Sequence, residues 1–126
     1  MANKTKNILI AEDEKPMAHA LELKLEKAGF TPYIVYDGES ALLALEKNDF
    51  AVILLDLIMP KIDGFGVLQI IREKKMNIPI IVLSNLGQSE DIEKAKKMGA
   101  KDYFSKSDTP INAIVDRVKQ ILDKKN

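Results

Sequence analysis

Short runs of Ile, Val and Leu alternate along the chain with longer amphipathic stretches, and this alternation constrains the fold more than any other feature. Continuous apolar runs of this length are typical of strands buried on both faces of a parallel sheet. Five runs are predicted to be strands: Asn7–Ala11, Thr31–Tyr36, Ala51–Leu55, Ile78–Leu83 and Asp102–Ser105.

The stretches between these runs carry helix signals. Pro16 suits the first turn of a helix and Gly29 suits its end. After Pro110, apolar residues recur at helical spacing from Ile111 to Leu122. Because strands alternate with helices, right-handed crossovers place helices on both faces of a parallel sheet. The predicted fold class is therefore α/β: a flavodoxin-like, doubly wound, five-stranded sheet of order 2-1-3-4-5 with five flanking helices.

Composition agrees with one soluble domain. The 126 residues are 46% apolar, which is enough for one core, so residues 1–126 are expected to form a single domain with its core at about 6–124. The formal net charge is zero, which predicts no direct binding of nucleic acid or of a membrane. The chain has no cysteine and no membrane-spanning run, which favours the cytoplasm.

Acidic residues follow the first and third predicted strands. Ligands of open parallel sheets bind beyond the strand C-termini where the strand order reverses, here between these two strands. Glu12, Asp13 and Glu14 follow the first strand, and Asp56 follows the third. Crowded carboxylates need a compensating cation to stay ionised, and ligands that are all oxygen favour Mg²⁺ or Mn²⁺. Glu14 is interpreted as a capping or surface residue and is left out of the site.

Two further strand ends add phosphate-binding groups. Ser84 follows the fourth predicted strand and Lys106 follows the fifth. Phosphoryl transfer depends on positioning and on neutralisation of charge by a metal, an ammonium group and hydrogen-bond donors. A carboxylate can itself be the nucleophile, and Asp56 is the acidic residue best presented by a buried strand.

These residues resemble the motif of the response-regulator receiver domains of two-component signalling, the kind of domain that forms the single-domain chemotaxis-type regulators. The resemblance covers nearly the whole chain. It rests on Glu12 and Asp13, on the run from Asp56 to Pro60 with Asp63-Gly64, and on Ser84 and Lys106.

The resemblance implies that Asp56 accepts a phosphoryl group from a phosphohistidine of a histidine kinase or a histidine phosphotransfer protein. Glu12, Asp13, Asp56 and the backbone carbonyl of Ile58 would bind the metal. Ser84 and Lys106 would bind the phosphoryl oxygens.

The resemblance also implies a switch. Ser84 would move toward the phosphoryl group and Tyr103 would turn inward, which would change the surface that a downstream effector protein reads. That surface is formed by the fourth helix, fifth strand and fifth helix. Whether phosphorylation causes dimerisation, and whether the chain stands alone or belongs to a longer regulator, stay open.

One position departs from the family pattern. The family lysine is commonly followed by a cis-proline, whereas Lys106 is followed by Ser107. A cis bond to a residue other than proline costs about 3 kcal/mol, so this loop is expected to be trans or unusually flexible. Leu86 and Ile58 are both apolar. They are expected to give no help to an attacking water, so self-dephosphorylation is predicted to be slow.

The same residues also allow simpler interpretations and rival classes of protein. Glu12 and Asp13 could belong to a solvated helix start, Ser84 could cap a turn, and Lys106 could be one of many surface lysines. A degenerate receiver would bind partners without phosphorylation. A haloacid-dehalogenase-like phosphatase would need a second aspartate where Ile58 stands. A flavodoxin-like cofactor binder would need a phosphate loop without acids after its first strand.

Overall fold

The computed structural model describes residues 5–85 and 88–123. Five strands alternate with five helices in the order β1, α1, β2, α2 and onward to α5. The strands are β1 Asn7–Ala11, β2 Thr31–Val35, β3 Val52–Asp56, β4 Ile80–Ser84 and β5 Asp102–Ser105. The helices are α1 Lys15–Lys27, α2 Gly38–Lys47, α3 Gly64–Glu73, α4 Ser89–Lys97 and α5 Ile111–Asp123.

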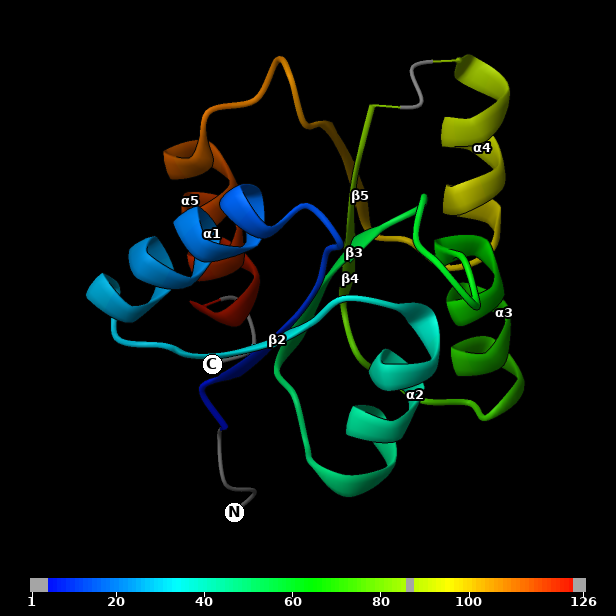
Figure 1. The fold of residues 1–126 in the computed structure, drawn as a ribbon, viewed down its shortest axis with the longest axis horizontal. Helices are drawn as coiled ribbons and strands as arrows, with labels where there is room; N and C mark the ends of the chain where they lie inside the picture. Colours follow the sequence, from blue (N-terminus) through cyan, green and yellow to red (C-terminus); the bar gives the residue numbers. More distant parts are fainter. Residues whose placement is uncertain (1–4, 86–87, 124–126) are drawn as a thin grey trace.

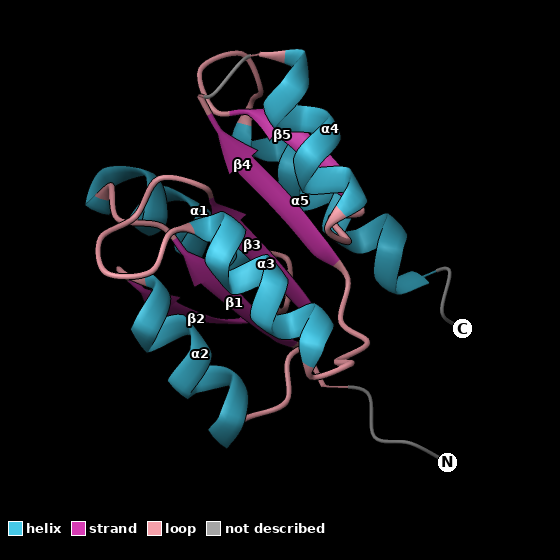
Figure 2. Ribbon diagram, turned by 90° about the vertical axis from the view of Figure 1, so that its right-hand side faces the viewer, coloured by secondary structure: helices cyan, strands magenta, loops and turns pink. Residues whose placement is uncertain are grey.

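All neighbouring strands are parallel, and the sheet order is β2-β1-β3-β4-β5. The predicted fold class and strand order are therefore confirmed. Helices α1 and α5 cover one face of the sheet, and α2, α3 and α4 cover the other, as Figure 1 and Figure 2 show. None of the helices in the described part of the chain is long and apolar enough to cross a membrane.

Alternating residues of the central strands supply the two cores. In β1, Ile8 and Ile10 pack with α1 and α5, whereas Leu9 packs with α2 and α3 on the opposite face. Because both faces are covered, β3 and β4 are buried at every position. This explains why their sequences are continuously apolar rather than alternating.

The predicted ends of three strands differ from the observed ends by one or two residues. The second strand ends at Val35, and Tyr36 lies outside it. Asp56 and Ser84 are the last residues of β3 and β4 rather than the residues that follow them. Strand pairing decides these ends, since Asp56 pairs with Leu83 and Ser84 pairs with Ser105.

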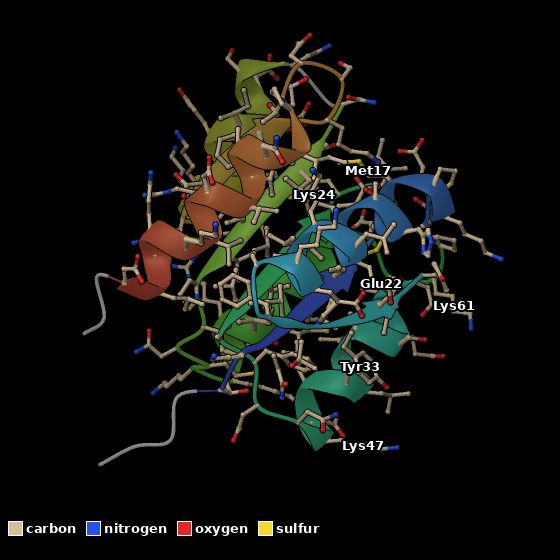
Figure 3. The ribbon with its side chains drawn as sticks, turned by 90° about the vertical axis from the view of Figure 1, so that its left-hand side faces the viewer. Met17, Glu22, Lys24, Tyr33, Lys47 and Lys61 are labelled. Atoms are coloured by element: carbon tan, nitrogen blue, oxygen red, sulfur yellow. The ribbon has the colours of Figure 1, made fainter. Side chains whose placement is uncertain are left out.

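The edge strand β2 is less buried than the central strands. Tyr33 lies on this edge beside α1 and α2, as Figure 3 shows, and its ring packs edge-on against Phe50. The first helix ends as predicted, because Gly29 has a φ of 93°, a conformation that favours glycine.

Candidate functional site

The C-terminal ends of β1 and β3 bring three carboxylates together. Single oxygens of Glu12, Asp13 and Asp56 all lie within 4.8 Å of one another. Glu12 is 1% exposed and Asp56 is 3% exposed, whereas Asp13 is exposed to solvent. The strand order reverses between β1 and β3, which is where ligands of such sheets bind. The acidic cluster therefore lies at the position predicted from the sequence.

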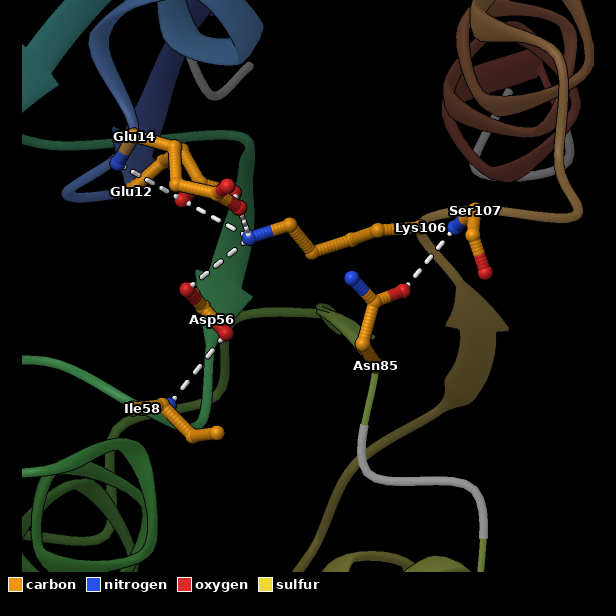
Figure 4. Close-up of polar contacts among 7 residues, drawn as sticks. All are labelled: Glu12, Glu14, Asp56, Ile58, Asn85, Lys106 and Ser107. Atoms are coloured by element: carbon orange, nitrogen blue, oxygen red, sulfur yellow. Dashed lines mark hydrogen bonds and ion pairs between the residues drawn. The ribbon is translucent and has the colours of Figure 1, made fainter.

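Lys106 enters the cluster from the end of β5 (Figure 4). Its Nζ lies 3.0 Å from Glu12 Oε2 and 3.2 Å from Asp56 Oδ2. The side chain is only 8% exposed, so Lys106 is not an ordinary surface lysine. A buried ammonium group and two buried carboxylates thus compensate one another's charge.

Burial governs the protonation of the two carboxyl groups. Loss of solvation raises the pKa of Glu12 to about 7 from an ordinary 4.5, although hydrogen bonds from Glu14 N–H and Lys106 oppose that rise. Burial also raises the pKa of Asp56, against the opposing effects of the Ile58 N–H and Lys106. Burial lowers the pKa of Lys106, but contacts with Glu14 and Glu12 outweigh it and hold this pKa above its usual value. Because burial disfavours the ionised form of these carboxyl groups, a cation bound beside them would stabilise that form.

Backbone groups orient the two buried carboxylates. Glu12 Oε2 accepts a hydrogen bond of 3.0 Å from Glu14 N–H, at the start of α1. Asp56 Oδ1 accepts one of 3.2 Å from Ile58 N–H. Glu12 thus accepts a hydrogen bond from a backbone N–H at the start of α1, in agreement with the simpler interpretation of the acidic residues. It also belongs to the carboxylate cluster. The Ile58 side chain is 55% exposed, and the role of its carbonyl stays a prediction.

Ser84 and Tyr103 lie on the neighbouring strands. Ser84 is fully buried at the end of β4, and α4 begins five residues later with Gln88 as its N-cap. The N-cap residue of α4 is therefore Gln88 and not Ser84. Burial raises the pKa of Tyr103, and a side-chain hydrogen bond with Ser84 opposes this rise. The two predicted switch residues are thus in contact.

The loop after Lys106 is hydrogen-bonded to the last residue of β4 and to the residue that follows it. The Lys106–Ser107 peptide bond is trans, as are the other peptide bonds of the described residues. Lys106 N–H donates to the Ser84 carbonyl at 3.1 Å, and Ser107 N–H donates to Asn85 Oδ1 at 2.9 Å. Of the two expectations for this loop, the trans one is confirmed. Leu86, on which the prediction of slow self-dephosphorylation partly rests, lies outside the described residues.

Sequence reasoning missed two residues of this site. Glu14 was left out, yet its carboxylate contacts Lys106 Nζ. It is the N-cap residue of α1, without a side-chain capping bond, and its side chain is 59% exposed, so the prediction of a capping or surface residue rather than a metal ligand is confirmed. The contact with Lys106 is the part that sequence reasoning missed. Asn85 was also missed, although a polar residue directly after a buried strand is a usable signal for a loop-ordering side chain.

A five-stranded, doubly wound sheet with buried carboxylates and a lysine at its switch point defines the chain as an α/β protein whose charged groups gather where such sheets bind their ligands. The family model of the response regulator receiver domain matches residues 8–119. The chain belongs to this family. It is a receiver domain of the kind found in two-component response regulators.

Known proteins similar to the chain agree with this assignment. It is 43% identical over 103 residues to the "Probable transcriptional regulator ycf27" of Galdieria sulphuraria, covering 82% of this chain and 40% of that protein. It is 35% identical over 119 residues to the alkaline phosphatase synthesis transcriptional regulatory protein PhoP of Bacillus subtilis, covering 93% and 48%. The chain therefore spans about half the length of these curated relatives.

A solved structure gives the same result for the fold. The receiver domain of the Francisella response regulator 1452 superposes with a TM-score of 0.90 at 32% identity, covering 95% of this chain and 98% of that one. The family and the relatives' printed names describe regulators rather than enzymes. The phosphatase and flavodoxin-like alternatives are therefore not favoured.

Proposed function

We propose that Asp56 is the phosphoryl acceptor of a signalling switch that depends on Mg²⁺ or Mn²⁺. The main support is the contact between the buried Asp56 carboxylate and Lys106, beside Glu12 and Asp13. In the transfer, an Asp56 oxygen forms a bond to phosphorus while the bond from phosphorus to the donor's imidazole nitrogen breaks. The electron pair of the broken bond stays on that nitrogen.

The residues present fit a divalent metal. Glu12 Oε1 is buried and accepts no hydrogen bond from any described residue, although Lys106 Nζ lies 3.0 Å away. Such an oxygen is a ready ligand for a hard cation. Glu12, Asp13 and Asp56, with the carbonyl of Ile58, would hold the ion, which would neutralise charge on the transferring phosphoryl oxygens.

The remaining groups would bind and report the phosphoryl group. Lys106 would exchange its contact with Asp56 for one with a phosphoryl oxygen, and the Ser84 hydroxyl would donate to another. Because Tyr103 of β5 is hydrogen-bonded to Ser84, movement of Ser84 would change the position of the Tyr103 side chain. The proposed readout is the surface formed by α4, β5 and α5, bound by a downstream effector protein.

Several finer assignments belong to the same proposal. The phosphoryl donor would be a histidine kinase or a histidine phosphotransfer protein, and the domain would act in the cytoplasm as a single unit with its core at about 6–124. Self-dephosphorylation would be slow. The absence of nucleic-acid binding is proposed for this chain alone, because the relatives are transcriptional regulators of about twice its length. Dimerisation on phosphorylation is left open.

The proposal is tested by intact mass after incubation with acetyl phosphate, with and without Mg²⁺. Wild type should gain one phosphoryl group only when Mg²⁺ is present, and Asp56→Asn should gain none while melting cooperatively. A phosphoryl adduct on Asp56→Asn would show that another residue is the acceptor. No adduct on wild type would favour a degenerate receiver that binds partners without phosphorylation.

A further inference from the structure

The Lys106 ammonium group has a third carboxylate partner, Glu14, besides Glu12 and Asp56. In Figure 4 the Glu14 and Glu12 carboxylates lie together on one side of Nζ, and Asp56 lies on the other. The partners differ in exposure, because the Glu14 side chain is 59% exposed and that of Glu12 is 1% exposed. Lys106 therefore joins the buried cluster to a carboxylate at the solvent.

Glu14 lies outside the group of carboxylates that could hold a metal ion. That group contains Glu12, Asp13 and Asp56 among the residues that the structure describes. Glu14 is the N-cap residue of α1 but makes no capping bond through its side chain. Neither metal coordination nor helix capping accounts for the position of its carboxylate, whereas the contact with Lys106 does.

A divalent cation at the cluster would change the balance of these contacts. Nζ lies 3.0 Å from Glu12 and 3.2 Å from Asp56, so a cation bound by the same carboxylates would repel it. Glu14 offers Lys106 an anionic partner that does not share the ion. Its negative charge also favours the cation directly, although its exposure to solvent weakens this effect.

We propose that Glu14 is a positioning residue that keeps the Lys106 ammonium group at the solvent-exposed side of the carboxylate cluster when a divalent cation binds. It then competes with the incoming phosphoryl group for the ammonium. This inference rests on the proposed function of Asp56. It predicts two effects of opposite sign, because Glu14 favours binding of a cation but opposes binding of an anionic donor and the transfer of Lys106 to it.

The test uses Glu14→Gln, which removes the charge and nearly preserves the shape of the side chain. Calorimetric titration with Mg²⁺ should give a dissociation constant about threefold higher than that of wild type. At saturating Mg²⁺, the rate of phosphorylation by acetyl phosphate, followed by intact mass, should rise about twofold. Loss of structure would lower both the affinity and the rate, so it cannot imitate this pair of results.

Two further variants separate the contact from general charge effects. Glu26→Gln removes an exposed charge from the same helix, about 18 Å along its axis from Glu14, and should leave both measurements unchanged. In a Lys106→Met background, Glu14→Gln should change the Mg²⁺ dissociation constant by clearly less than in wild type. An equal change in both backgrounds would overturn the proposed role of the contact.

Failure of this inference differs from failure of the proposed function. If wild type takes no phosphoryl group although it binds Mg²⁺, the function of Asp56 is wrong, and the titrations still test whether Glu14 acts through Lys106. If wild type is phosphorylated on Asp56 and Glu14→Gln matches it in Mg²⁺ affinity and in rate, the inference about Glu14 is wrong.

Discussion

The two sides of the site are built differently. On the acceptor side, β1 and β3 are central strands, and Asp56 ends a strand that is buried throughout. On the output side, all four residues of β5 are only half-buried, and α4 buries the single residue Ala95. The acceptor is thus held by dense packing, whereas α4 and β5, two of the three elements proposed to respond, bury few apolar side chains; the third, α5, buries four.

Besides the buried Ala95, α4 makes two polar or polarisable contacts with α3 near the surface. Lys94 Nζ lies 4.3 Å from the centroid of the Phe65 ring, and Arg72 Nη1 donates at 3.1 Å to the carbonyl of Lys97. Such exposed contacts contribute little free energy compared with burial of aliphatic side chains. An element held in this way can move at small cost, which suits a switch.

The largest effect is expected from a change that displaces the acceptor strand. A Cβ added at Gly64 would lie 2.4 Å from the Asp56 carbonyl oxygen and 2.6 Å from Leu57 Cα, both rigid backbone. Gly64→Ala should lower the free energy of unfolding by about 2 to 4 kcal/mol in urea denaturation and slow phosphorylation of Asp56.

Gly66→Ala is the matched control, because its added Cβ would meet a side-chain atom, the Cγ2 methyl of Ile62 at 2.7 Å, rather than backbone. A side chain can shift more readily than backbone, so the variant should lose clearly less stability than Gly64→Ala, about 1 kcal/mol, and be phosphorylated at the normal rate. If the two alanine variants lost the same stability, the dense packing of the acceptor strand would not explain the effect.

An intermediate effect is expected from pH. The pKa of Glu12 is about 7 in the folded protein and 4.5 ordinarily, so the folded state binds more protons between these values. Without metal, the free energy of unfolding should therefore fall as pH rises through this window, by about 1 to 3 kcal/mol for this group. The raised pKa of Asp56 acts in the same direction.

Urea denaturation at pH 5 and pH 8 in the presence of a chelator measures this dependence, and Glu12→Gln should reduce it. Added Mg²⁺ should stabilise the protein more at pH 8, because only ionised carboxylates bind the ion. Equal pH dependence in wild type and Glu12→Gln would show that Glu12 does not retain its proton in the folded protein.

The smallest effect on global stability is expected at α4. Arg72→Ala removes the hydrogen bond to the Lys97 carbonyl at the end of that helix and should cost about 0.5 to 1 kcal/mol. Amide hydrogen exchange should accelerate in α4 while β3 stays protected. Faster exchange in both elements would mean that the acceptor and output sides open as one unit.

Much of the fold was predictable from local pattern. Strand runs such as Ile8–Ile10 and Ile53–Leu55 are continuously apolar, and this pattern predicts burial on both faces. Helix signals such as Pro16 and Gly29 act within a few residues. The order of strands then brings Glu12, Asp13 and Asp56 to one edge, since parallel strands share their carboxyl ends.

Tertiary structure alone decided which charged groups became partners. Lys106 reaches Glu12 across 94 residues of sequence and also contacts Glu14, a residue that local pattern assigned to a helix start. Asn85 similarly accepts a hydrogen bond from Ser107, which lies 22 residues later in the sequence. The composition and order of strands therefore determined where the site lies. Its charge pairing depends on side-chain reach and burial, which exist only when distant strands lie side by side.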